Sequence, residues 1–159
     1  SNWVVVQQVG DTLVRISSGD YFADVNPTPI AKLSGSHSYA TGIASSFIGS
    51  GSAGDISSLL ASMDVNFDTG SINNGSLNVM AGDQTWSVNF EGLVQAGAAD
   101  LDVIQGQLFD SSGVISNVID GDLGGVFTGN KAEAFVGGFG LLDIINPLNS
   151  VDGLFTIER

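Results

Sequence analysis

Residues 123–127 read Leu-Gly-Gly-Val-Phe, residues 135–139 read Phe-Val-Gly-Gly-Phe, and residues 153–157 read Gly-Leu-Phe-Thr-Ile. Each segment has a glycine two positions before a phenylalanine. Because side chains alternate across a strand, both residues then point to the same face. Small barrels combine small and large residues on their inner face, and glycine lets a strand bend or approach its neighbour closely. The repeat therefore predicts three strands of a barrel or sandwich whose inner face combines glycine and phenylalanine.

The segments before this repeat carry the same strand signature. Between residues 61 and 119 apolar residues recur at alternate positions, and turn sequences such as Asp68-Thr69-Gly70 and Ala81-Gly82-Asp83 interrupt the runs. Short strands at this spacing predict an all-β protein with little helix. The aromatic residues spaced for strand interiors, and so expected in the core, are Phe67, Trp86, Phe90, Phe127, Phe139 and Phe155.

The first third of the chain is less regular. With 159 residues we expect one domain over residues 1–159, in which 1–35 form an irregular N-terminal segment and 36–159 the barrel strands. Within the first part, residues 3–8 and 12–16 have the composition of two short strands. Residues 42–58 are rich in Ser, Gly and Ala and are predicted to form a long loop.

The charge balance excludes several classes of function. There are 17 acidic and 4 basic residues, a net charge of −13. So few basic groups cannot neutralise a run of phosphates, so we expect no nucleic-acid partner, and an anionic membrane would repel the chain. The absence of cysteine excludes disulfides, thiolate metal sites and a cysteine nucleophile. We expect no membrane insertion, because no stretch approaches the roughly 18 apolar residues of a spanning helix.

One motif suggests catalysis. Asp68-Thr69-Gly70-Ser71 follows an apolar strand, as in pepsin-like aspartic proteases, whose chemistry needs two carboxylates sharing a proton. A chain with one such motif would supply the second carboxylate only by forming a homodimer. The preceding strand alternates polar and apolar residues, and the sequence also makes a good tight turn. We therefore favour a turn, with Asp68 as a remote catalytic candidate.

Other polar residues give weaker signals. His37 is the only histidine and lies between serines, so a structural or surface role is favoured over a catalytic or metal-binding one. The acids of residues 64–68 and 120–122 resemble parts of calcium loops, but their spacing does not match one. We predict no metal site and no cofactor.

Four aromatic residues fall in irregular segments and are the candidates for exposed recognition residues, although ordinary packing is favoured. They are Trp3, Tyr21, Phe22 and Phe47.

The second half resembles a known family. Gly124-Gly125-Val126-Phe127-Thr128-Gly129 is followed by Ala132-Glu133 and then by Gly137-Gly138-Phe139, and Gly153-Leu154-Phe155 closes the chain. This order is similar to the barrel domains of bacterial transferrin-binding protein B and its relatives. The resemblance covers residues 60–159, and more weakly 28–41. It implies an antiparallel up-and-down eight-stranded β-barrel on an exported surface protein, with residues 1–35 as a remnant or extra strands. It transfers no binding residue, and transferrin binding is not carried over.

We therefore predict a non-enzymatic exported bacterial module, extracellular or at the cell surface, that binds a protein or small ligand. The start of the chain lacks the basic region and cleavage site of a signal peptide, so for an exported protein we expect the chain to be the mature form or a fragment of a longer protein. The alternative is a structural or adhesive building block that self-assembles or forms part of a larger surface protein. A homodimeric aspartic protease is a remote third hypothesis. The ligand-binding residues stay unknown at this point.

Overall fold

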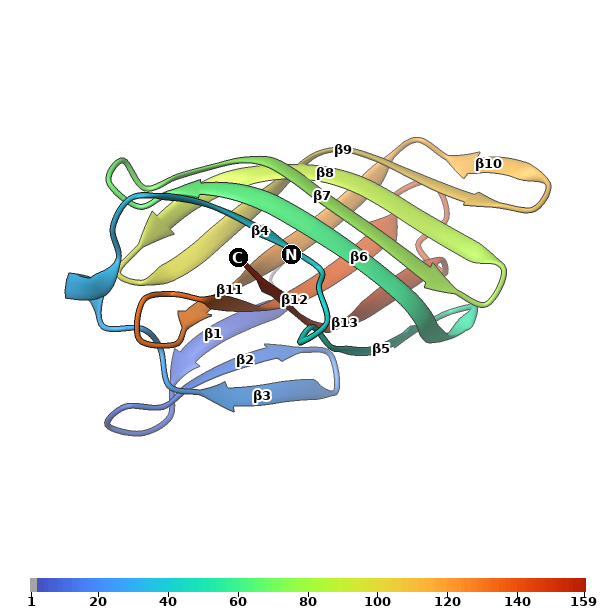
Figure 1. Cartoon of the computed structure of the whole chain (residues 1–159). Helices are drawn as coiled ribbons and strands as arrows, with labels where there is room; N and C mark the ends of the chain where they lie inside the picture. Colours follow the sequence, from blue (N-terminus) through green and yellow to red (C-terminus); the bar gives the residue numbers. More distant parts are fainter. Residues whose placement is uncertain (1–2) are drawn as a thin grey trace.

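A computed structural model describes residues 3–159 and contains no α-helix among them, only the short 3-10 turn η1 (Ile30–Lys32). Eight antiparallel strands form a closed barrel, as predicted (Figure 1). They are β4 (Ser36–Ala40), β6 (Gly54–Asn66), β7 (Ser71–Ala81), β8 (Gln84–Gln95), β9 (Ala98–Asp110), β11 (Ile119–Thr128), β12 (Ala134–Asp143) and β13 (Ser150–Glu158). The pairing of β8 with β9 closes the ring.

Two further strands extend the barrel sheet. β5 (Phe47–Gly51) pairs with β13 and with the start of β6, so β4 and β5 together bridge β13 and β6. β10 (Gly113–Ser116) forms a hairpin with the end of β9 that projects beyond the barrel wall (Figure 1). The predicted long loop over residues 42–58 is therefore wrong, because most of that segment lies in β5 and β6.

The two short strands predicted over residues 3–8 and 12–16 are present, but the N-terminal segment as a whole is regular where we expected irregular structure. Within residues 1–35, β1 (Val4–Gln8), β2 (Val14–Ser18) and β3 (Tyr21–Val25) form an antiparallel sheet of their own. This sheet packs on the outside of β11, β12 and β13 (Figure 1). Ile16 is the centre of the contact, against Val126, Val136 and Leu154.

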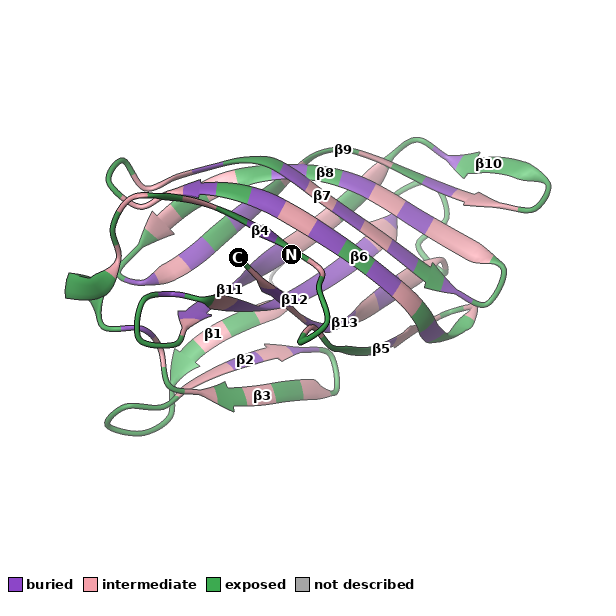
Figure 2. Cartoon of the chain, in the orientation of Figure 1, coloured by how far each residue is buried: buried purple, intermediate pink, exposed green. Residues whose placement is uncertain are grey.

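Because the small sheet covers them, β11, β12 and β13 are buried on both their inner and their outer faces. Val126, Val136 and Leu154 point outward, and without the small sheet they would be exposed. Hydrogen bonds fix the sheet in place: the Ser18 hydroxyl donates to the Phe139 carbonyl at 2.6 Å, and the Val4 amide donates to Asp122 at 2.8 Å. Figure 2 shows continuous burial along β12, whereas β6 alternates.

Aromatic rings fill the barrel interior. A side chain facing a hollow interior would be accessible to water, yet Phe127, Phe135 and Phe139 are 0% exposed. The ring centroid of Phe127 lies 4.9 Å from that of Phe135 and 4.8 Å from that of Phe67, within the range of favourable aromatic pairs. Of the predicted core aromatics only Phe67 is partly exposed. The others expose at most 2%: Trp86, Phe90, Phe127, Phe139 and Phe155.

Inward-facing glycines leave the space that these rings occupy. A Cβ atom at Gly125 would lie 2.6 Å from Phe135 Cζ and 2.8 Å from the Cα of Gly137, and one at Gly137 would lie 2.6 Å from Phe155 Cζ. Carbon atoms pack at about 3.5–4.0 Å, so no side chain fits at either position. The pairing of glycine with phenylalanine read from the sequence is thus a steric requirement of the closing strands.

We predict that Gly125→Ala destabilises the protein by about 1–3 kcal/mol, because the added methyl group overpacks the interior. The matched control is Gly10→Ala, where the nearest atom to a new Cβ is Leu13 Cβ at 3.6 Å, an ordinary contact. The midpoint of urea unfolding measures both changes. Equal stability of the two variants would show that Gly125 is not sterically required.

Tyr39 generates a second prediction. Its buried hydroxyl donates to the Ala132 carbonyl, and burial raises its pKa from 10.0 to about 12. Because the folded-state pKa exceeds the unfolded one, the stabilising contribution is complete below pH 10 and is lost as the pH rises from 10 to 12. Tyr39→Phe should lower the free energy of unfolding at pH 8 by about 1–3 kcal/mol. Between pH 10 and 12 the free energy of unfolding of the variant should also fall less steeply than that of the parent, as measured by unfolding titrations. Parallel curves for the two proteins would contradict this.

Asp152 lies on the outer face of β13 beneath the β2–β3 turn, where a Cβ at Gly19 would meet its carboxylate. Burial, together with repulsion from Asp20, raises the Asp152 pKa above 3.8. The fold therefore loses stability as the pH rises from about 3.8 through that raised pKa, and the loss is complete above it. Asp152→Asn should increase the free energy of unfolding at pH 7, and the gain should vanish below about pH 3.8, where both states of the parent are protonated. A loss of stability at pH 7 would refute the assignment.

Candidate functional site

Asp68 lies in the hairpin turn between β6 and β7, as the turn interpretation predicts. The Asn66 side chain accepts hydrogen bonds from the Asp68 and Thr69 amides, and Gly70 has a φ of 79°, in the left-handed region. The Asp68 carboxylate accepts a hydrogen bond from the Gly35 amide at 3.2 Å. The motif thus forms an Asx turn that closes a hairpin, and its carboxylate ties that turn to the entry of β4.

His37 lies on β4 and faces the same side as the inward-pointing Tyr39, two residues further on. Its ring centroid is 6.1 Å from that of Phe67, and its Nε2 is 3.0 Å from the Ser34 carbonyl oxygen. The ring is half-buried at the end of the barrel, so it has a packing role and is not simply solvated.

The acidic residues do not converge on a metal site in the part of the chain that the structure describes: no three His, Cys, Asp or Glu side chains come together there. Asp64 instead accepts hydrogen bonds from Asn74 and Ser38, at 2.9 and 2.7 Å, which lower its pKa. Asp122 accepts a hydrogen bond from the Val4 amide, and residues 120–122 lie within β11 rather than in a loop of the kind that binds calcium. These carboxylates stabilise the fold locally.

Two of the four aromatic candidates are exposed. Phe22 on β3 is 59% exposed and Phe47 on β5 is 41% exposed, and with Ile48 they line an apolar groove of about 270 Å³ between the small sheet and the barrel. Trp3 packs against Gly140, and Tyr21 donates to the Ser50 hydroxyl at 2.8 Å. The groove thus begins where the small sheet meets β5.

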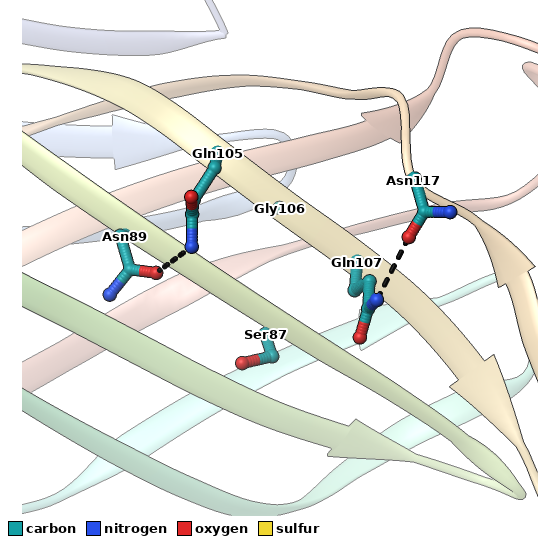
Figure 3. Close-up of a pocket in the computed structure, with 6 residues that line it drawn as sticks. All are labelled: Ser87, Asn89, Gln105, Gly106, Gln107 and Asn117. Carbon is teal, nitrogen blue, oxygen red and sulfur yellow. Dashed lines mark hydrogen bonds between the residues drawn. The ribbon is translucent and has the colours of Figure 1, made fainter.

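A second hollow on the outer wall has a different character. It measures about 340 Å³ and is polar (Figure 3). Its lining residues are Ser87, Asn89, Gln105, Gly106, Gln107 and Asn117. The polar side chains alternate with inward apolar ones on β8 and β9, so they form a ladder on the outer face.

Hydrogen bonds position the amides of this hollow, which we call the amide pocket. Gln105 Nε2 donates to Asn89 Oδ1 at 3.0 Å, and Gln107 Nε2 donates to Asn117 Oδ1 at 2.8 Å (Figure 3). Asn117 comes from the connection between β10 and β11. It reaches the wall because β9 pairs with β11 only from Ala98 to Leu101 and then diverges into the β9–β10 hairpin.

Part of the amide pocket can be recognised from the sequence. Ser87 and Asn89, like Gln105 and Gln107, occupy alternate positions of predicted strands. Their pairing across β8 and β9, in the registers Ser87↔Gln107 and Asn89↔Gln105, depends on a bulge next to Phe90. A register set by a bulge is not readable from strand periodicity, so sequence reasoning did not identify the pocket.

Residues 3–159 include no helix long and apolar enough to cross a membrane.

The comparisons with known proteins concern the fold. No protein-family model matches the chain, and no curated protein matches it. Solved structures do match. The transferrin-binding protein B of Haemophilus parasuis Hp5 aligns with a TM-score of 0.53 and 13% identity, over 99% of this chain and 37% of that one. The isotype 1 protein of serogroup B Neisseria meningitidis aligns with a TM-score of 0.56 and 14% identity, over 100% and 35%.

Intact Ap-TbpB, which contains N and C lobes, aligns with a TM-score of 0.57 and 13% identity, over 99% of this chain and 38% of that one. This chain therefore spans little more than a third of each solved chain. At such identity the likeness concerns the fold alone. The resemblance predicted from residues 60–159 is confirmed at that level and extends over the whole described chain, which shares the fold of transferrin-binding protein B barrels.

Proposed function

We propose that this chain is a non-enzymatic, exported bacterial β-barrel module that binds a protein or small ligand at the cell surface. The proposal rests on one contrast: side chains fill the barrel interior, whereas the outer wall holds polar side chains already fixed by hydrogen bonds. Rings such as Phe127 and Phe139 are 0% exposed and occupy the interior. The amide pocket, by contrast, holds hydrogen-bonding groups that are already positioned. Ligands would therefore bind outside the barrel.

The structural neighbours support a binding role rather than a catalytic one. They are named as transferrin-binding proteins, and they share this fold over nearly the whole chain. Since the chain spans little more than a third of them, transferrin is a partner to be tested. A surface location is proposed on the same ground, together with the Ser-, Asn- and Gln-rich exterior.

A structural building block is the second candidate, and one observation favours it. Apolar side chains are exposed at the end of the barrel that carries the β9–β10 hairpin and the β12–β13 connection. They are Val114 (56% exposed), Ile144 (51%), Ile145 (73%) and Leu148 (82%). Exposed apolar residues of this kind are typical of contacts between proteins. A net charge of −13 opposes contact between identical copies.

A thermal-shift screen tests the binding proposal. The probes are iron-loaded and iron-free transferrin, haem, and small neutral and charged saccharides. A ligand at one hundred times its Kd should stabilise the fold by about 2.7 kcal/mol, or roughly 5–10 °C in Tm. Sedimentation velocity of the protein alone is the companion measurement. If no probe raises Tm while the protein associates as its concentration rises, the building-block function replaces the binding function.

A further inference from the structure

The amide pocket has unused hydrogen-bonding capacity. Gln105 and Gln107 each donate from their NH₂ group within the chain, and their Oε1 atoms accept no hydrogen bond within residues 3–159. The Nδ2 group of Asn117 and the hydroxyl of Ser87 have no partner within the same residues. The pocket therefore offers two acceptors, an NH₂ donor and a hydroxyl that can do both.

The pocket is also uncharged in a strongly acidic protein. None of its six lining residues is ionisable, although the chain has 17 acidic residues. The nearest acidic pair along the same two strands is Glu91 and Asp102, which face each other in the β8–β9 register. These carboxylates would repel an anionic ligand, and no carboxylate lies within the pocket to bind a cation. The arrangement selects a neutral ligand.

The groups that the amide pocket presents are side chains. Over this stretch β8 and β9 pair with each other, so the backbone groups of their shared edge are already used. The pocket also lacks the apolar recesses that receive alternate side chains of an extended peptide. A neutral ligand that carries many donors and acceptors around its rim fits better. Sugar hydroxyls have this property, because each one donates once and accepts twice.

We propose that the amide pocket binds the hydroxyl groups of a neutral saccharide. This inference rests on the proposed binding function and names its ligand class. The acceptors Gln105 Oε1 and Gln107 Oε1 would receive hydroxyl protons, and Asn117 Nδ2 would donate to a hydroxyl or ring oxygen. The two existing amide pairs hold these side chains in place, which lowers the entropy lost on binding.

An NMR titration of the ¹⁵N-labelled protein tests the inference. The probes are neutral hexasaccharides of glucose, galactose and mannose, with a sialylated and a sulfated oligosaccharide for comparison. A neutral probe should shift the backbone and side-chain amide signals of Ser87, Asn89, Gln105, Gln107 and Asn117, whereas the anionic probes should not. Saturable shifts that move with the probe concentration give the Kd.

The double variant Gln105→Met/Gln107→Met removes the polar atoms and keeps the side-chain length. It should weaken binding of the neutral probe by about tenfold or more, since two hydrogen bonds are lost. The matched control is Gln7→Met, an exposed strand amide of the small sheet away from the pocket, which should leave the Kd unchanged. Unchanged spectra of the other residues establish that the double variant is folded.

Three results overturn the inference: no neutral probe shifts these signals, the double variant binds as well as the parent, or an anionic probe binds more tightly. If the neutral probes fail but another ligand raises Tm in the thermal-shift screen, only the ligand class is wrong. If both experiments are negative, the binding function fails as well.

Discussion

The steric fit between inward glycines and phenylalanine rings on β11, β12 and β13 is the constraint on which the structure depends. At Gly125 and Gly137 any side chain would collide with a ring or with the facing strand. The rings can therefore lie against the backbone and fill the barrel, and Phe127 contacts both Phe67 and Phe135. An eight-stranded barrel is just wide enough for side chains to fill its interior, so the packed core leaves only the outer surface for the proposed ligand.

The same closing strands bury their outer faces too. Val126, Val136 and Leu154 receive the N-terminal sheet through Ile16, so β11, β12 and β13 form the middle layer of three. Within residues 3–159 the wall on the opposite side, β6 to β9, has no such cover. It presents Ser, Asn and Gln to solvent, together with a few exposed apolar side chains such as Leu60 and Ile104. The protein thus has one wall that packs against its own chain and one that is free for a partner, and the amide pocket lies on the free wall.

The sequence predicted what depends on periodicity and missed what depends on distant contacts. The Gly-x-Phe repeat identified the closing strands and their inner faces, because both features repeat every second residue. Strands were predicted near β1 and β2, but β3 and the packing of the small sheet on the barrel were not, since an outward Val126 or Leu154 looks the same whether solvent or a sheet covers it. β5 was missed because its Ser and Gly residues have low strand propensity and it is stabilised by pairing with β13. The amide pocket depends on the divergence of β9 from β11, which no local pattern encodes.

Nuclear Overhauser contacts in a sample labelled only on its phenylalanine rings show whether packed, mutually tilted rings fill the barrel. A filled interior should give an unbroken series of cross-peaks between neighbouring rings, from Phe67 through Phe127, Phe135 and Phe155 to Phe139. Rings that lack these cross-peaks and instead show contacts to water would contradict it. The interior would then be hollow, and a ligand could bind inside the barrel.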